Sequence, residues 1–186
     1  DTVTVNAAGT GSDVTASVGA QLSAFTADIE FDVVDSFGGL TAVMGSADPA
    51  SYLTEANSIP VDDGNGGSTV TANDGAILAS FTADIEFDVV DNAAGLIAQM
   101  DGVNPAGHLT EADSITVDDV NTGRVVGAND GAILASFTAD VDFDVVDSAQ
   151  AIATELSAHG VGSLDEAADV VASGSIVDAE DAAAIM

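Results

Sequence analysis

One stretch of eleven residues occurs three times, almost unchanged, and it constrains the fold more than any other feature of the chain. The second copy begins at Phe81 and reads FTADIEFDVVD, and the other copies begin at Phe25 and Phe137. The spacing is therefore constant, because 81 − 25 = 56 and 137 − 81 = 56. A constant period without insertions predicts a tandem-repeat architecture rather than one ordinary domain.

Apolar and polar residues alternate strictly through each copy of this stretch. In the second copy one side carries only apolar residues, which are Phe81, Ala83, Ile85, Phe87 and Val89. The opposite side is polar and mostly acidic, with Thr82, Asp84, Glu86 and Asp88. A period of two predicts a half-buried strand, with one face toward a core and the other presenting a row of carboxylates. We call this stretch the acidic strand.

A short amphipathic helix is predicted after each acidic strand. A pair of short polar residues stands where the helix would begin, at Asp35-Ser36, Asp91-Asn92 and Asp147-Ser148. Such side chains can accept hydrogen bonds from the free N–H groups of a first helical turn. Glycines predict the ends of the three helices, at Gly45, Gly102 and Gly160.

The rest of each unit predicts two short strands and a second helix. Residues 58–71 and 114–127 alternate around turn residues and are interpreted as hairpins, with Pro60 at a sheet edge. Residues 73–78 and 129–134 begin with Asn-Asp-Gly and continue with Ala-Ile-Leu, which predicts a helix. The glycine in the first turn, Gly75, weakens that prediction because glycine disfavours helices.

These segments together predict an α/β tandem repeat. About three strand-helix-hairpin-helix units would dock into an elongated array, and a mostly-β solenoid is the alternative. The expected boundaries are a degenerate partial repeat at 1–24, repeat one at 25–80, repeat two at 81–136 and a shortened repeat three at 137–186. The last unit stops inside a helix-like segment, which we interpret as a fragment or as a subunit end that docks on another chain.

The charge balance limits which partners the chain can have. It contains 32 acidic residues and one basic residue, Arg124, for a formal net charge of −31, yet 47% of its residues are hydrophobic. The apolar content is enough for a core, so the charge does not indicate disorder. A strongly negative chain is expected to bind neither nucleic acid nor an anionic membrane, and it attracts cations.

Calcium is the cofactor that the acidic residues would suit, and no organic cofactor is expected. Ca²⁺ takes six to eight oxygen ligands, so one strand alone is too sparse and a neighbouring acidic turn would have to contribute. The candidate metal ligands lie on the acidic strands and on two acidic turns: Asp28, Glu30, Asp32, Asp62, Asp63, Asp84, Glu86, Asp88, Asp118, Asp119, Asp140, Asp142 and Asp144. A solvated acidic face, or a protein adapted to high salt, is the alternative interpretation.

Nothing in the sequence predicts an enzyme. The same carboxylates recur in every copy, whereas a pair of catalytic carboxylates needs two different environments within one site. No serine stands in a Gly-x-Ser-x-Gly motif, and the two histidines, His108 and His159, occupy unrelated positions in the repeat. A repeated structural role explains this pattern better than catalysis does.

Two motifs resemble a known group of proteins. The pattern Val-Val-Asp-Asn/Ser-Ala, followed by the strand Ser-Ile-Thr-Val-Asp at 114–118, is similar to units of very large bacterial tandem-repeat surface proteins. These are adhesin-like, S-layer-like or fibre-forming, and the resemblance covers residues 25–186. It implies an extracellular or cell-surface structural protein that self-associates into a homopolymer, such as a filament, surface layer or adhesin stalk, with calcium as a bridge. The alternative is a calcium-dependent module that binds a carbohydrate, such as a cell-surface glycan, or another cell.

Overall fold

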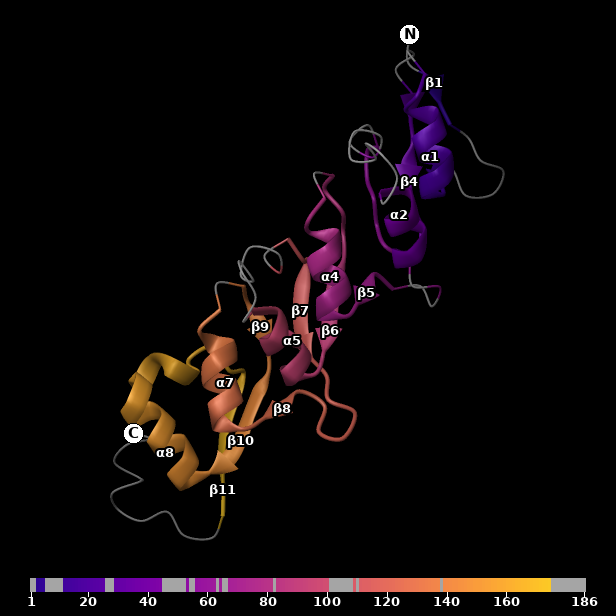
Figure 1. Ribbon diagram of the computed structural model, residues 1–186. Coiled ribbons are helices and arrows are strands. Elements are labelled where there is room, and N and C mark those ends of the chain that lie inside the picture. Colours follow the sequence, from indigo (N-terminus) through magenta and orange to yellow (C-terminus); the bar gives the residue numbers. More distant parts are fainter. Residues whose placement is uncertain are drawn as a thin grey trace. The chain divides into compact units, whose positions relative to one another are not determined.

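The computed structural model has a mixed α/β fold with parallel strands (Figure 1). The chain divides into two compact units, Asp1–Val89 with Glu111–Asp113, and Val90–Thr110 with Ser114–Met186. The structure describes residues 3–5, 12–25, 29–44, 53, 56–62, 64, 67–81, 83–100, 109, 111–137 and 139–174. Within these ranges no helix is long and apolar enough to cross a membrane.

Short strands and helices alternate along both units. The first unit contains β1 (Val3–Thr4), β2 (Asp13–Val14), α1 (Ala16–Leu22), β3 (Ile29–Glu30), β4 (Asp32–Val33), α2 (Phe37–Met44), β5 (Thr69–Val70) and α4 (Ala72–Leu78). Strand β6 (Asp88–Asp91) spans the division between the units. The second unit contains α5 (Ala93–Met100), β7 (Ser114–Val117), β8 (Val125–Val126), α7 (Ala128–Ala135), β9 (Val141–Asp142), β10 (Asp144–Ser148), α8 (Ala149–His159), the 3₁₀ helix η1 (Val161–Leu164) and β11 (Asp169–Ser173).

The predicted hairpins are wrong, because the strands of these segments form parallel pairs with more distant strands. β5 pairs in parallel with β6, β7 with β9, and β8 with β10. The turn residues of the second predicted hairpin make only a local antiparallel bridge between Asp119 and Gly123. Parallel strands need a long crossover connection, and the helices between the paired strands provide it.

Each acidic strand is divided between two parallel partners that precede it in the chain. The first half pairs with the more distant segment, in the registers Thr4↔Glu30, Pro60↔Glu86 and Thr116↔Asp142. The second half pairs with the nearer segment, directly before a helix, in the registers Asp13↔Asp32, Thr69↔Asp88 and Val125↔Asp144. Both sets of registers recur at the spacing of the acidic strands.

The expected edge position of Pro60 is also wrong. The segment 57–62 is hydrogen-bonded on both sides: the Val33 N–H donates to the Ser58 carbonyl at 2.9 Å, and the Val61 N–H donates to the Glu86 carbonyl at 3.1 Å. Pro60 has no N–H to donate, and its neighbours provide the bonds instead. One short segment therefore joins two consecutive acidic strands.

The alternation predicted for the acidic strand is confirmed by burial. Phe31, Phe87 and Phe143 are fully buried, and acidic residues beside them are exposed or half-buried. The first residue of each copy differs from the prediction, which placed it on the core side: Phe81 and Phe137 are half-buried, and Phe25 is 64% exposed. No buried polar or charged residue occurs in the described part of the chain, so the core is apolar.

The predicted starts of the first set of helices are confirmed. The side chains of Ser36, Asn92 and Ser148 each accept a hydrogen bond from an N–H in the first turn of α2, α5 and α8. Helix α8 ends at His159, and Gly160 follows with a φ of 92°, as the glycine predicted. The predicted ends at Gly45 and Gly102 lie outside the described residues.

The second set of helices, α4 and α7, also matches the prediction, and the structure explains the glycine in each first turn. A Cβ built on Gly75 would lie 2.8 Å from Val89 Cγ2 and 3.1 Å from Phe87 Cε2. A side chain at this position would therefore push α4 away from the acidic strand. The lost helix propensity is the cost of this close packing.

Candidate functional site

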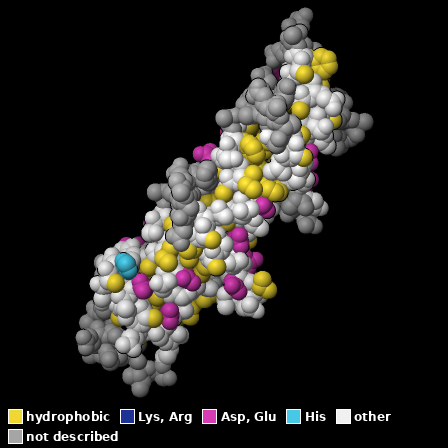
Figure 2. All heavy atoms as spheres, in the orientation of Figure 1, with side chains coloured by type: hydrophobic (Ala, Val, Ile, Leu, Met, Phe, Trp, Pro, Cys, Tyr) yellow, Lys and Arg dark blue, Asp and Glu magenta, His cyan; other side chains and the backbone are white. Residues whose placement is uncertain are grey.

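The candidate metal ligands follow the solvent side of the acidic strands and the turns beside them. Of those described, six are exposed, which are Glu30, Asp84, Glu86, Asp118, Asp140 and Asp142. Five are half-buried, which are Asp32, Asp62, Asp88, Asp119 and Asp144. Asp28 and Asp63 lie outside the described residues. On the face shown in Figure 2, acidic side chains are scattered among neutral and hydrophobic ones.

The half-buried carboxylates in the middle of each acidic strand have hydrogen-bond donors at equivalent positions. The hydroxyl of Ser12 donates to Asp32, and the hydroxyl of Ser68 donates to Asp88. Asp32 also accepts a bond of 3.1 Å from Ser58. The third donor, at the position equivalent to Ser68 in the next copy, is Arg124. The sequence showed none of these pairings, because the partners are far apart along the chain.

Arg124 shows that a cation fits beside this row of carboxylates. Its guanidinium forms an ion pair with Asp142, and its Nη2 lies 3.4 Å from Asp144 Oδ1. The charge of Asp142, and secondly that of Asp144, raises the pKa of Arg124. All three side chains are solvent-accessible, so water and salt weaken the attraction. The arrangement positions a cation more than it stabilises the fold.

A second set of aspartates, outside the predicted site, accepts hydrogen bonds from backbone N–H groups at the starts of two helices each. Asp147 Oδ2 accepts from the Ala128 N–H of α7 at 3.0 Å, and its Oδ1 accepts from the Ser148 N–H before α8 at 2.7 Å. Asp35 makes the equivalent bonds to Ala16 and Ser36, at 2.9 and 2.8 Å. The sequence predicted these aspartates beside one helix start, and the structure shows that each serves two.

The predicted calcium turns use their carboxylates locally. Asp62 Oδ1 accepts from the Gly64 N–H at 2.8 Å, and Asp119 Oδ1 accepts from the Asn121 N–H at 2.9 Å. These are Asx-turns, which fix the backbone of the loop. Among the described residues, no three or more acidic or histidine side chains form a group that could hold a metal ion. Calcium binding therefore stays a prediction.

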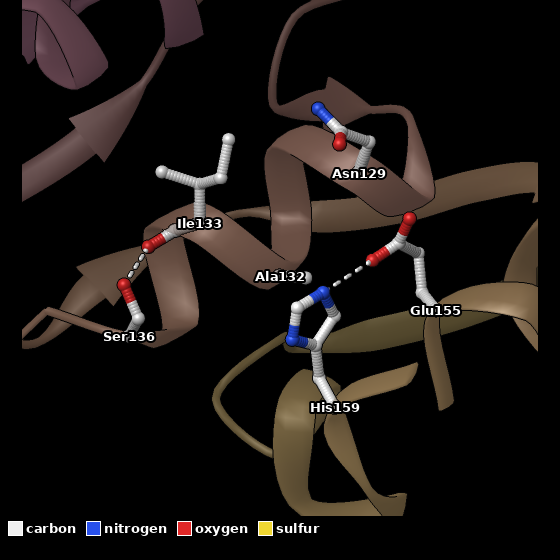
Figure 3. Close-up of a pocket in the computed structure, with 6 residues that line it drawn as sticks. All are labelled: Asn129, Ala132, Ile133, Ser136, Glu155 and His159. Carbon is white, nitrogen blue, oxygen red and sulfur yellow. Dashed lines mark hydrogen bonds and ion pairs between the residues drawn. The ribbon is translucent and has the colours of Figure 1, made fainter. Parts of the chain in front are cut away.

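A shallow hollow lies between α7 and α8 in the second unit (Figure 3). Its volume is about 190 Å³, and its lining residues are Asn129, Ala132, Ile133, Ser136, Glu155 and His159. His159 Nε2 lies 3.6 Å from Glu155 Oε2, one helical turn away. The Ser136 hydroxyl donates to the Ile133 carbonyl of its own helix turn at 2.6 Å. The hollow is smaller than typical ligand pockets of about 300–1,000 Å³.

Comparison of the chain with known protein families, with curated proteins and with solved structures gave no match. The function is therefore inferred from the contacts described above.

Proposed function

We propose that the chain is an extracellular structural protein whose copies assemble into a filament, surface layer or adhesin stalk. Its repeated α/β units would dock in series, and cations, calcium among them, would bridge the acidic surfaces of neighbouring copies. No reaction is assigned to it. The main support is that the same set of contacts recurs at the spacing of the acidic strands, in both compact units of the fold.

Helix packing gives the clearest example of this recurrence. Gly75 lies against Val89 and Phe87, and Gly131 lies against Val145 and Phe143 in the same way. Gly19 makes the equivalent contact in the first copy. A side-chain arrangement that is kept from one copy to the next suits a protein whose function depends on repetition of a structural unit.

The shared strand segments explain how such units could dock. Segment 57–62 is bonded to residues 31–35 on one side and to Glu86 on the other. Neighbouring acidic strands thus share one segment between them. Units that share hydrogen bonds in this way stabilise each other, which each repeat needs because so short a chain is marginally stable alone.

The cation requirement follows from the charge. Two copies that each carry a formal charge of −31 repel each other unless ions screen or bridge them. The ion pairs of Arg124 with Asp142 and Asp144 show the geometry in which the row accepts a positive charge. At the equivalent positions of the earlier copies stand Ser12 and Ser68, so a dissolved cation would have to supply that charge there.

Negative-stain electron microscopy of the purified chain, in Ca²⁺ and again after chelation, tests the proposal. We expect filaments or sheets in Ca²⁺ that come apart in chelator. Assemblies that persist in chelator would support the structural role and remove calcium from it. Isolated particles in Ca²⁺, in chelator and in high salt would contradict the proposal.

A further inference from the structure

Strand β11 corresponds to the shared segments 57–62 and 113–118. The N–H groups of Asn57, Asp113 and Ala168 donate to the carbonyls of Phe31, Phe87 and Phe143, respectively. β11 then continues along β10 in five parallel register pairs, from Asp144↔Asp169 to Ser148↔Ser173. One side of β11 is therefore bonded to an acidic strand, as in the earlier copies.

Among the described residues, no strand pairs with the other side of β11, whereas its equivalents have a partner there. Pro60 pairs with Glu86, and Thr116 pairs with Asp142 of the following acidic strand. In the described part of the chain, β11 lies at the end of a sheet ordered β11-β10-β8. The Ala172 N–H is equivalent to the Val61 N–H, which donates to the Glu86 carbonyl, and the Val170 carbonyl is equivalent to the Ile59 carbonyl, which accepts from the Glu86 N–H. These two groups of β11 therefore face away from β10.

The apolar face of β11 is also exposed where its equivalents are buried. Val170, opposite Val145 in the pairing with β10, is 43% exposed, whereas Ile59 and Ile115 are 2% and 3% exposed. Ala172 is exposed, whereas Val61 is buried. In the described part of the chain, segments 57–62 and 113–118 thus lie between two acidic strands each, whereas β11 is paired with one.

The first acidic strand, in contrast, has an edge that only a short strand occupies. There β3 is paired with the short strand β1, and the Val5 N–H donates to the Glu30 carbonyl at 3.0 Å. Val5 is half-buried, although its equivalent, Val61, is buried. Ile29 is likewise half-buried, although its equivalent, Ile85, is buried. β1 therefore fills this position less completely than the inner segments do.

We propose that β11 of one copy replaces β1 of a second copy, so that it lies between its own β10 and β3 of that second copy. The Ala172 N–H would donate to the Glu30 carbonyl of the second copy, and Val171 would lie opposite Glu30. The inference rests on the proposed self-assembly and specifies the surface that mediates it. Main-chain bonds of this kind are the usual basis of strand addition.

Repeated addition of β11 of one copy to β3 of a further copy would form an open chain of copies. The donating surface, β11, and the accepting surface, β3, are different parts of the molecule, so the contact is heterologous. Repeated heterologous contacts that do not close on themselves form fibres. Charge repulsion between copies must be screened, and at about 1 M salt the Debye length falls to about 3 Å.

Register-specific disulfide cross-linking tests the exchange, because the chain contains no cysteine of its own. We would mix full-length Val171→Cys with full-length Glu30→Cys in about 1 M NaCl under mild oxidation. Adjacent strands are about 4.8 Å apart, within the range that a disulfide spans. We expect a covalent heterodimer on a non-reducing gel.

Glu86→Cys, mixed with Val171→Cys, is the matched control. Glu86 is also exposed, but segment 57–62 already occupies its strand edge. We expect at least a tenfold lower yield of heterodimer from this pair. Equal yields from the two pairs, or no cross-link from either, would overturn the exchange. If wild-type copies still assemble but the cross-link does not form, the exchange of β11 is wrong and the proposed self-assembly stands. If neither assemblies nor the cross-link form, the proposed function is wrong as well.

A pair of proline variants gives a second measurement. Ala172→Pro removes the outward N–H, whereas Val171→Pro places proline where the first shared segment carries Pro60 naturally. Light scattering after size-exclusion chromatography should show assembly of Val171→Pro and only monomers of Ala172→Pro. Circular dichroism checks that both variants fold. Wild-type assembly of folded Ala172→Pro would overturn the proposal.

Discussion

Gly75 illustrates how single residues set the spacing between a helix and the acidic strand. A Cβ built on Gly75 would lie 2.8 Å from Val89 Cγ2, so a methyl group there would force the helix or the strand to shift. Gly38, at the exposed start of α2, is different, since a Cβ there would meet nothing closer than 4.0 Å. The two glycines are therefore a matched pair for testing close packing against helix propensity.

We predict that Gly75→Ala lowers the free energy of unfolding by about 1–2 kcal/mol. Overpacking costs about 1–3 kcal/mol, and the better helix propensity of alanine returns up to about 1 kcal/mol. Gly38→Ala should raise the stability by about 0.5 kcal/mol, because only the propensity changes. Urea denaturation of both variants measures the difference. A stabilised Gly75→Ala would contradict the close packing of α4.

At the scale of residues, hydrogen bonds between sequence neighbours were predictable from the sequence, and hydrogen bonds between distant residues were not. The caps Ser36, Asn92 and Ser148 follow from short polar side chains before an apolar run, and the structure confirms them. The second bond of Asp147, to the Ala128 N–H, joins residues that are distant in the sequence. No local pattern predicts such a bond, because its geometry depends on how β8 and β10 pair.

Strand pairing is the point at which prediction of the elements failed. Turn residues near Gly64 and Gly123 favoured hairpins, and alternation alone cannot distinguish a parallel from an antiparallel partner. The parallel partners lie on either side of an intervening helix, and a turn signal does not report such a pairing. The spacing of the acidic strands was the more informative signal, since the registers repeat at that same interval.

The pairing predicts which positions of a shared segment tolerate proline. Thr116 is equivalent to Pro60, and Val117 is equivalent to Val61, whose N–H donates to Glu86. We expect Thr116→Pro to lower the free energy of unfolding by only about 1 kcal/mol, and Val117→Pro by about 3 kcal/mol or more. Thermal and urea unfolding of the two variants measure this. Equal losses would contradict the assigned direction of the bonds.

At the scale of the whole molecule, charge is the main opposing force. The chain has a formal net charge of −31 and one basic residue, so almost every carboxylate increases the repulsion that folding must overcome. The carboxylates of Asp84, Glu86 and Asp140 are all exposed. Dissolved cations are the available compensation for such groups, and their effect should therefore appear in the stability of the fold itself.

We predict that the Tm of the chain rises by at least about 3 °C between about 0.01 and 1 M NaCl, because the Debye length falls from about 30 to about 3 Å. The variant Asp84→Asn/Glu86→Gln/Asp140→Asn keeps the shapes of three exposed side chains and removes their charges. It should melt at a higher temperature than the wild type in low salt and at nearly the same temperature in high salt. Differential scanning calorimetry of both proteins across the salt series measures the two slopes. Parallel slopes would show that salt acts on something other than the charges of the acidic strands, and repulsion would then no longer explain why assembly should need cations.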